Sequence, residues 1–456
     1  MSAYNEFIAS KRHTSGQFGF EPLWMPKEIR DFQEFVVEKG TRKGRTGLFL
    51  DTGLGKTRVQ LSIAQNVVMH TNGKVLILTP LAVGFQFIDE AQKIGIDNIE
   101  HFKSGTHTKK IVVCNYERLH LLDPDDFECV MLDESSILKN FQGSLRDQII
   151  AFMKRVKYRY LSTATPSPND FIELGNSSEA LGYMGYMDML TKFFKSNQNT
   201  ADSNNRNIGE KFYLKPHAER DFFAWVNTWS IMAKMPSDLG FSNDGYILPA
   251  LHTHEHVVRN DDMWSSDGQL NMFAQQAKTL TEVRNEQKQT INDRCEKAVE
   301  LAEGKTSVYW CNLNEESALL SSLDSEAVEI IGSMSVDKKE ELLMAFASGD
   351  IKRLVTKAKM TGMGLNWQHC NHTVFFPTFS YEQYYQAIRR FWRFGQTKEV
   401  TCDMVISEGQ SRVIQALNEK VQKAIELHKN LVDNANRAFT HEVKAFDKQV
   451  EKPGFL

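Results

Sequence analysis

The chain has 456 residues, 54 basic and 58 acidic, and a formal net charge of −4 at pH 7. This length predicts two to four domains, and the nearly balanced charge excludes a wholly basic nucleic-acid coat while leaving room for a local basic groove. Six cysteines without CxxC spacing favour reduced thiols over a disulfide framework. The N-terminus lacks the apolar core of a signal peptide, and the longest apolar stretch, Val75–Ile88, is too short to span a bilayer. We therefore expect a cytoplasmic protein without a membrane partner.

The first pattern along the chain is GLFLDTGLGKT at Gly47–Thr57, an apolar strand followed by a glycine-rich loop and a helical segment. Such a loop offers backbone N–H groups, an ammonium and a hydroxyl to phosphates and magnesium. Leu50 stands where the usual signature has glycine, so an ordinary glycine-rich turn is the alternative. We predict that Lys56 contacts the β- and γ-phosphates and that Thr57 ligates Mg²⁺. The loop residues predicted to contact the nucleotide are Thr52, Gly53, Leu54, Gly55, Lys56 and Thr57.

The second pattern is CVMLDESS at Cys129–Ser136, an apolar strand that ends in two acids. Ligands of parallel α/β sheets gather at the carboxyl ends of strands. We predict that Asp133 holds the magnesium ion and that Glu134 orients and deprotonates the attacking water. The alternative is that both acids cap the helix that follows, because carboxylates suit helix N-termini.

Short β-branched runs alternate with helical patterns in residues 26–180 and again in residues 300–410. This alternation predicts an α/β fold with two parallel sheets covered by helices. In the first half the expected strands are Gly47–Leu50, Val75–Thr79, Ile111–Asn115, Val130–Asp133 and Arg159–Thr163. In the second half they are Ser307–Cys311, Ala327–Ile331, Arg353–Thr356, Thr373–Phe376 and Val400–Ile406.

The region between these halves differs in composition. Ser196–Gly209 is rich in Asn and Ser and lies between KFFK and KFYLK, whose basic and aromatic residues could grip a nucleic-acid strand. The alternative is that these aromatics pack a helical insert. His252, His254 and His256 would share one face of a strand, where a metal site is possible but not favoured by the spacing. A polar helix is expected over residues 270–303, and the chain is helical and lysine-rich after residue 407.

The segment QAIRRFWRFGQ at Gln386–Gln396 is predicted to be an arginine-rich helix that completes a nucleotide site from the opposite side. Its arginines would neutralise negative charge on a phosphate during phosphoryl transfer. The alternative is a solvated helix face, or pairing with nearby acids such as Glu382.

Several segments resemble, in order and spacing, the motifs of Swi/Snf-like ATPases in helicase superfamily two (DEAD/DEAH-type). They are KVLILTPLAVGFQFIDEAQK at Lys74–Lys93, IVVCNYERL at Ile111–Leu119, DESSILKN at Asp133–Asn140, LSTATPSPNDFIEL at Leu161–Leu174, RLVTKAKMTGMGLN at Arg353–Asn366 and QAIRRFWRFGQ. The chain departs from the family at Ser136, where the family has histidine, and at Trp392, which takes the place of a frequent histidine. The compact size resembles helicase-like ATPases encoded by bacteriophages and prophages, which would place the protein in a bacterial host cytoplasm.

The resemblance implies two RecA-like lobes with a helical insert and a C-terminal helical brace, using ATP and Mg²⁺. It implies that Gln33 reads adenine, that Gly364 and Gln386 contact the nucleotide, and that Arg390 and Arg393 act as arginine fingers. Three residues would couple the ATP site to the nucleic-acid track: Ser136, Thr163 and Thr165. Track contacts would come from Thr79, Pro80, Gly84, Tyr116, Asn312, Lys357 and Asn366.

The expected domains are lobe one at 1–180, an insert with a loop at 181–256, a helical connection at 257–300, lobe two at 301–410 and C-terminal helices at 411–456. The function favoured by the motifs is a DNA-dependent ATPase that acts as a monomer and translocates on or remodels duplex DNA. One alternative is a strand-separating helicase on RNA or forked DNA. Another is an ATP-gated binding module that recruits replication or packaging proteins.

Overall fold

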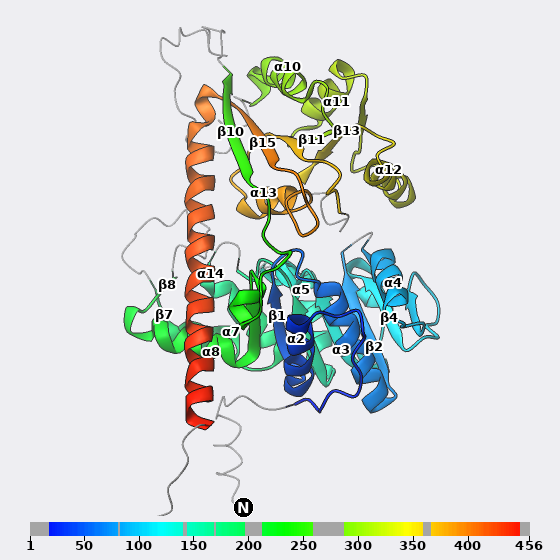
Figure 1. Ribbon diagram of the computed structural model, residues 1–456, viewed down its shortest axis with the longest axis vertical. Coiled ribbons are helices and arrows are strands. Elements are labelled where there is room, and N and C mark those ends of the chain that lie inside the picture. The colour runs from blue at the N-terminus through cyan, green and yellow to red at the C-terminus, as the bar shows by residue number, and fades with distance from the viewer. Residues whose placement is uncertain are drawn as a thin grey trace, which may run out of the picture. The chain divides into compact units, whose positions relative to one another are not determined.

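The computed structural model of the chain describes residues 18–80, 83–139, 144–167, 170–196, 212–258, 287–358 and 366–446 (Figure 1). Two compact units divide the chain. We call lobe one the unit formed by residues up to Thr79, Phe87–Asn243 and the chain from Ala424 onward. Lobe two contains Pro80–Gln86 and Asp244–Lys423.

The sheet of lobe one has seven strands in the order β3-β4-β2-β5-β6-β1-β9, and all its pairs are parallel. The strands are β1 (Arg45–Leu50), β2 (Lys74–Thr79), β3 (Ile99–His101), β4 (Ile111–Asn115), β5 (Phe127–Asp133), β6 (Tyr158–Ser162) and β9 (Ser230–Ala233). The five strands predicted for this half are confirmed as β1, β2, β4, β5 and β6, while β3 and β9 were not predicted.

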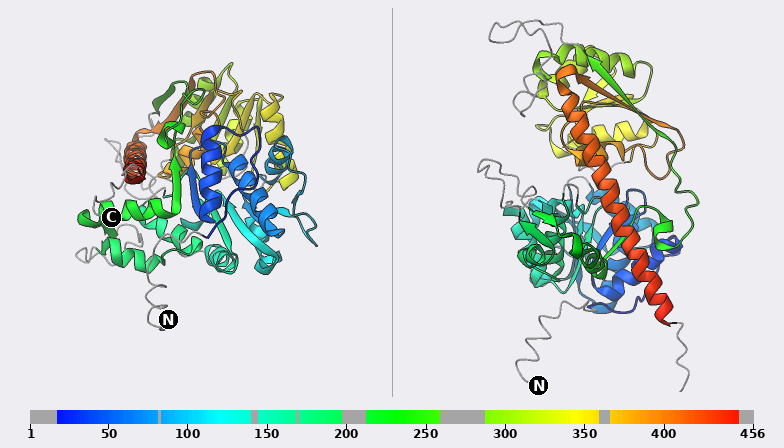
Figure 2. Two further views of the ribbon diagram at one scale, coloured as in Figure 1. Left: turned by 60° about the horizontal axis from the view of Figure 1, so that its bottom comes forward. Right: turned by 90° about the vertical axis from the view of Figure 1, so that its left-hand side faces the viewer.

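Helices cover this sheet, as the views in Figure 2 show for the blue and cyan elements. They are α2 (Asp31–Lys43), α3 (Lys56–Thr71), α4 (Gly84–Lys93), α5 (Ser144–Arg155), α6 (Leu174–Leu181), α7 (Tyr186–Phe193) and α8 (Glu219–Trp229). Every residue of β4 and β6 is buried, the pattern of strands covered on both faces. The α/β fold class is thereby confirmed for this half.

The aromatic residues of the insert are core residues. Phe222, Phe223 and Trp229 on α8 are fully buried, and Phe193 and Phe194 are buried beside them. They share one hydrophobic cluster with Phe49 of β1. The prediction that the KFFK aromatics pack in the core is therefore confirmed. A short hairpin follows, formed by β7 (Phe194–Ser196) and β8 (Phe212–Leu214). Its Tyr213 is 49% exposed.

The sheet of lobe two has six parallel strands in the order β10-β15-β14-β11-β13-β12. They are β10 (Leu251–Val258), β11 (Ser307–Cys311), β12 (Ala327–Glu329), β13 (Arg353–Lys357), β14 (His372–Phe375) and β15 (Val400–Ser407). The helices are α10 (Ile291–Ala302), α11 (Asn314–Leu323), α12 (Val336–Ser348) and α13 (Tyr381–Ile388). All five strands predicted for this half are confirmed, as is the α/β fold class.

The histidines of β10 do not form a metal site among the residues that the structure describes. His256 Nε2 lies 2.9 Å from Asp403 Oδ1, and His372 Nε2 lies 2.8 Å from Asp403 Oδ2. His252 contacts Glu399 instead. This carboxylate–histidine network connects β10, β14 and β15 and is a structural feature of the sheet.

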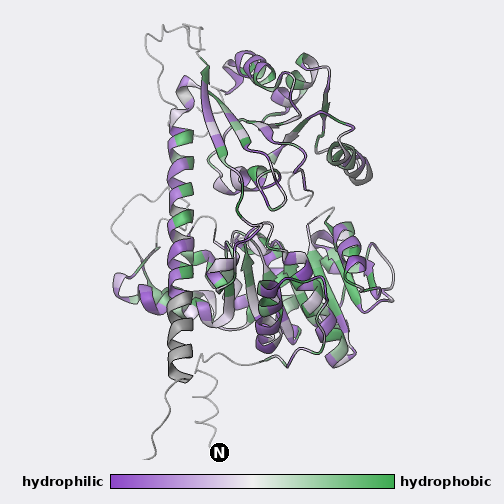
Figure 3. Cartoon of the chain, viewed as in Figure 1, coloured by the Kyte–Doolittle hydropathy of each residue, from purple (hydrophilic) through white to green (hydrophobic). Residues whose placement is uncertain are grey.

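The last described element is the helix α14 (Ser411–Phe446), which confirms the prediction of a helical C-terminal segment as far as Phe446. Apolar residues recur between polar ones along it in Figure 3. Val413 and Leu417 in its first part are buried, and so are Leu431 and Val432 in its second part. None of the described helices is long and apolar enough to cross a membrane.

Candidate nucleotide site

The phosphate loop is the sharp turn between β1 and α3. It runs over residues 51–55, and it needs left-handed backbone at Gly53 (φ 95°) and Gly55 (φ 78°), a conformation that favours glycine. Gly55 is the N-cap of α3 and supplies no side-chain cap. The first N–H groups of a helix lack intrahelical partners and attract anions, so this turn has the form of a phosphate cradle.

Lys56 lies across the loop. Its Nζ donates to the carbonyl oxygens of Leu50 at 3.0 Å and Asp51 at 3.4 Å. Its charge also lowers the pKa of the Asp133 carboxyl, which places the ammonium near the carboxyl end of β5. Thr57 follows it as the second residue of α3. The structure thus gathers the loop and the first acid of the pair at one edge of the sheet.

Gln33 contacts the loop through its side-chain amide. Its side chain is 4% exposed, its Nε2 donates to Leu54 O at 2.9 Å, and its Oε1 accepts from Arg30 N at 3.1 Å. A Cβ on Gly55 would lie 2.1 Å from Gln33 Nε2, so the two residues are in direct contact. The amide nitrogen holds the loop and the amide oxygen caps the start of α2. The contact of Gln33 with adenine stays a prediction.

Asp133 ends β5 as a carboxylate that is costly to ionise. Burial raises its pKa to about 6, with a smaller contribution from Glu134, while the hydrogen bond from Gln60 and the charge of Lys56 oppose the rise. Gln60 Nε2 donates to Asp133 Oδ1 at 2.9 Å, and Tyr116 donates its hydroxyl to the Asp133 carbonyl at 2.6 Å. Gln60 was not identified from the sequence, because helical periodicity marks a buried face but not a contact.

The donors present fit Mg²⁺. A carboxylate at Asp133 and a hydroxyl at Thr57 are hard oxygen ligands of the kind this ion prefers. The buried Gln60 Oε1 beside Asp133 has no hydrogen-bond partner among the described residues, which leaves a further oxygen acceptor for a bound water. A divalent cation would also compensate the buried charge that raises the pKa of Asp133.

Glu134 has a strained backbone and a fixed side chain. Its φ of 56° is left-handed, a conformation that costs a non-glycine residue about 1–3 kcal/mol and is common at functional sites. Its Oε1 accepts from Thr163 Oγ1 at 2.7 Å and from Ser136 Oγ at 3.0 Å. Thr163 Oγ1 in turn accepts from the backbone N–H of Thr165 at 3.0 Å. The three residues predicted to couple ATP to the track therefore converge on the predicted base.

Buried hydroxyls without partners gather at the same edge of the sheet. Each follows or ends a central strand, and none has a hydrogen-bond partner among the described residues: Thr79, Ser135, Ser162, Thr165 and Ser167. Buried polar groups are normally hydrogen-bonded, so orphans at a strand edge mark a place for a ligand or water. Ser135, Ser162 and Ser167 were not predicted as site residues, although they sit inside the motifs DESS and STATPS.

The predicted track residues differ in exposure. Thr79, Gly84 and Tyr116 are buried, and Pro80 is half-buried. Their contacts with nucleic acid stay predictions. Three predicted track residues belong to lobe two. Asn312 Nδ2 donates to Phe376 O at 2.9 Å, and Lys357 Nζ donates to Asn314 Oδ1 at 2.5 Å. Asn366 is exposed.

The arginines that follow α13, Arg389, Arg390 and Arg393, lie in turns and bends and not in a helix. α13 ends at Ile388, so the prediction of a helix over Gln386–Gln396 was wrong for residues 389–396, which are most of that segment. Tertiary contacts explain the break, because Trp392 Nε1 donates to Pro249 O at 2.7 Å and Trp367 N donates to Arg390 O at 3.0 Å.

These half-buried arginines form a positive cluster. Burial and, to a smaller extent, the charges of Arg390 and Arg389 together lower the pKa of Arg393 to about 10. Arg393 Nε has no hydrogen-bond partner within the part of the chain that the structure describes. Like charges held close together repel one another and a bound anion would offset that repulsion, so the cluster is suited to a phosphate. Gln386 lies half-buried on α13, and Gly364 falls outside the described residues.

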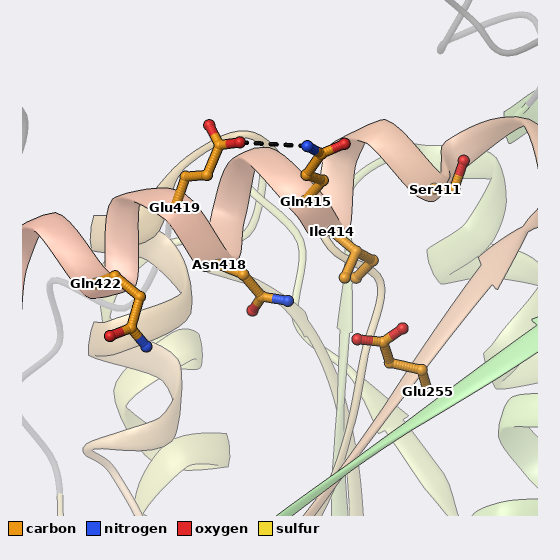
Figure 4. Close-up of a pocket in the computed structure, with 7 residues that line it drawn as sticks. All are labelled: Glu255, Ser411, Ile414, Gln415, Asn418, Glu419 and Gln422. Atoms are coloured by element: carbon orange, nitrogen blue, oxygen red, sulfur yellow. Dashed lines mark hydrogen bonds between the residues drawn. The ribbon is translucent and has the colours of Figure 1, made fainter.

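A shallow groove elsewhere in lobe two holds none of the predicted site residues. Its volume is about 630 Å³, and it is lined by Glu255 of β10 and residues of α14 (Figure 4). Gln415 Nε2 donates to Glu419 Oε1 at 3.3 Å along its rim. The phosphate loop of lobe one and the arginine cluster of lobe two remain two candidate phosphate-binding regions, each described within its own unit.

A family model matches part of the chain. Residues 285–395 match the family model described as the helicase conserved C-terminal domain. No curated protein matches the chain. A solved structure, the Sulfolobus solfataricus SWI2/SNF2 ATPase core in complex with dsDNA, matches with 16% sequence identity and a TM-score of 0.39, over 85% of this chain and 90% of that chain.

Proposed function

We propose that the protein is a nucleic-acid-dependent ATPase that uses ATP and Mg²⁺ to translocate on or remodel duplex DNA. The single observation that carries the proposal is the convergence on Glu134 of Thr163 and Ser136, beside Asp133 and the phosphate loop. The match of residues 285–395 to the helicase conserved C-terminal domain supports a second lobe of helicase type. The preference for duplex DNA rests on the resemblance of the sequence motifs to Swi/Snf-like ATPases.

The chain's own groups divide the work of hydrolysis. The backbone of the phosphate loop and Lys56 bind the phosphates, and Glu134 orients a water and accepts its proton. Hydrogen bonds from Thr163 and Ser136 hold the Glu134 carboxylate in one orientation. Asp133 and Thr57 would hold Mg²⁺, which supplies charge neutralisation on the phosphates when bound. Arg390 and Arg393 are proposed to neutralise charge on the γ-phosphate.

Coupling to the track is proposed to pass through the same hydrogen bonds. Thr165 N donates to Thr163 Oγ1, which donates to Glu134. A change in the STATP segment, when nucleic acid binds, would therefore change the orientation of the base. This arrangement favours an enzyme over an ATP-gated recruitment module, since a passive module has no need of a base held in strained backbone.

One experiment separates these functions. ATP turnover is compared with duplex DNA, single-stranded DNA and RNA for the wild type, Glu134→Gln and Glu128→Gln. Glu128 is an exposed residue of the same strand β5 and serves as the matched control. We expect duplex DNA to stimulate the wild type and Glu128→Gln alike, and Glu134→Gln to lose about 10²–10⁴-fold in turnover while still binding ATP. Stimulation by RNA alone would favour the strand-separating alternative. Equal turnover by Glu134→Gln and the wild type would refute the assignment of the base.

A further inference from the structure

A fully buried ion pair lies in lobe two, between α10 and α11. Arg294 Nη2 lies 2.8 Å from Glu316 Oε1, and both side chains are 0% exposed. Removing two charges from water is costly, and their attraction offsets that cost only when the geometry is good and further hydrogen bonds are made. A buried pair is therefore weak evidence for stability, and its other contacts indicate what it does.

The Glu316 carboxylate holds the turn that follows β11. Its Oε2 accepts from the backbone N–H groups of Asn312 at 2.8 Å and Leu313 at 2.9 Å. Glu316 is the third residue of α11 and Leu313 is the N-cap, so the second of these bonds is one half of a capping box. Capping requires neither burial nor an arginine. The pair with Arg294 therefore adds something beyond the start of a helix.

Asn312 is also held through its side chain. Its Nδ2 donates to Phe376 O at 2.9 Å. The guanidinium of Arg294 lies over the ring of Phe376, with 4.9 Å between Arg294 Cζ and the ring centroid. Arg294 thus contacts both residues that fix Asn312, namely Glu316 and Phe376. Asn312 itself is half-buried and comes directly after the carboxyl end of β11.

Arg294 is fixed from its own helix. Its Nε donates to Thr290 Oγ1 at 3.0 Å, and its Nη2 donates to the carbonyl oxygen of Gln287. Its Nη1 has no hydrogen-bond partner among the residues that the structure describes. A buried donor without a partner is unfavourable, so this arrangement is not the one that stability alone would favour.

We propose that Arg294 and Glu316 are positioning residues for nucleic-acid binding, and that the buried pair holds Asn312 in the geometry that contacts the phosphate backbone of duplex DNA. The inference rests on the proposed function and adds to it two residues of lobe two that act through Asn312. Phosphate contacts fix the register of a protein on the duplex, so they depend on exact placement of the contacting residue. Neither member of the pair is exposed, so neither touches the DNA itself.

A purely structural pair would behave differently. Its loss would lower the free energy of unfolding, and other substitutions that destabilise α10 would affect DNA binding equally. Ala298→Gly supplies that comparison. Ala298 is 0% exposed and lies one turn after Arg294 on α10, and glycine destabilises the interior of a helix.

The first experiment measures the Kd for a fluorescently labelled DNA duplex, and the thermal unfolding, of full-length wild type, Glu316→Gln, Asn312→Ala, the double variant and Ala298→Gly. Glu316→Gln keeps the shape of the side chain and removes the charge that faces Arg294. We expect it to raise the Kd about tenfold, with Ala298→Gly within about twofold of the wild type. In the Asn312→Ala background it should raise the Kd less than about twofold, because both substitutions remove the same contact.

Two results of this cycle would overturn the inference. One is a Kd for Glu316→Gln that matches the Kd for Ala298→Gly. The other is an equal effect of Glu316→Gln with and without Asn312.

The second experiment replaces the pair as a unit. Arg294→Met/Glu316→Leu leaves no unpaired buried charge, and replacing a buried ion pair by apolar residues is often neutral or stabilising. It also removes the acceptor of the Asn312 N–H, so we expect wild-type thermal unfolding with a Kd for the duplex raised about tenfold. Wild-type DNA affinity in this variant would overturn the inference and leave the proposed function standing. A wild type that binds no duplex DNA would overturn both.

Discussion

Replacing Gly55 with alanine tests how the phosphate loop is shaped. Gly55 has φ 78°, and a Cβ at this position would lie 2.1 Å from Gln33 Nε2 and 3.2 Å from Gln33 Cδ. Gln33 cannot swing away without loss, because it is 4% exposed and its Nε2 donates to Leu54 O. The methyl group therefore either unwinds the left-handed turn or breaks the contact that supports it.

The expected loss of nucleotide affinity in Gly55→Ala follows from these two effects. Left-handed backbone costs a non-glycine residue about 1–2 kcal/mol. Loss of the Gln33–Leu54 hydrogen bond costs about 1 kcal/mol more. Gly55→Ala should therefore weaken nucleotide binding by about 2–3 kcal/mol, or roughly 30- to 150-fold in Kd. In a Gln33→Ala background the steric part is absent, so the same substitution should cost only about 1–2 kcal/mol.

The assay is a nucleotide titration on the four members of this double-mutant cycle, with thermal unfolding of each. Gly95→Ala is the matched control, because Gly95 has φ 77° but no described heavy atom lies within 4 Å of its Cβ position. It should lower the free energy of unfolding by about 1–2 kcal/mol and leave the Kd unchanged. Wild-type affinity in Gly55→Ala, or equal costs of the substitution with and without Gln33, would refute the reasoning.

Three further predictions concern the base, the arginines and the acid stability of lobe two. Thr163→Val removes the donor to Glu134 Oε1 and should lower turnover about tenfold with ATP affinity unchanged, as a comparison of kcat with Kd would show. Arg393→Ala should bind ATP normally but lose on the order of 10³-fold in DNA-stimulated turnover. Hydrogen bonds such as that from His372 outweigh burial and lower the pKa of Asp403 to about 2. The free energy of unfolding should therefore fall as the pH drops from about 4 towards 2. Asp403→Asn should remove that part of the acid-unfolding curve.

The central strands could be predicted from the sequence because buried parallel strands read as apolar runs bounded by turns. Ile111–Asn115 and Ser307–Cys311 have the bounds that the sequence predicts. β9 could not be found this way, because it has four residues and follows α8 directly. The strand at His252–His256 was predicted, but its pairing with β15 joins residues 147 positions apart, which no local pattern reveals.

In the candidate site, too, some residues could be predicted from the sequence and others could not. Motif spacing identifies Lys56, Asp133 and Glu134 because their chemistry requires those residue types at those strand ends. The contacts that hold them, such as Gln60 on Asp133, depend on which helix face meets which strand. The end of α13 at Ile388 depends on a tertiary hydrogen bond from Trp392, which overrides the local helical pattern.

The measurement that tests the central claim most directly is phosphate release from ATP by purified wild type and Lys56→Ala, each with and without duplex DNA. Removal of the ammonium takes away the loop's charged contact with the phosphates, and no other loop residue can replace it. The account predicts DNA-stimulated release by the wild type and background release by Lys56→Ala, with both proteins folded by circular dichroism. Equal release by the two proteins, or a wild type that releases no phosphate with any nucleic acid, would contradict it.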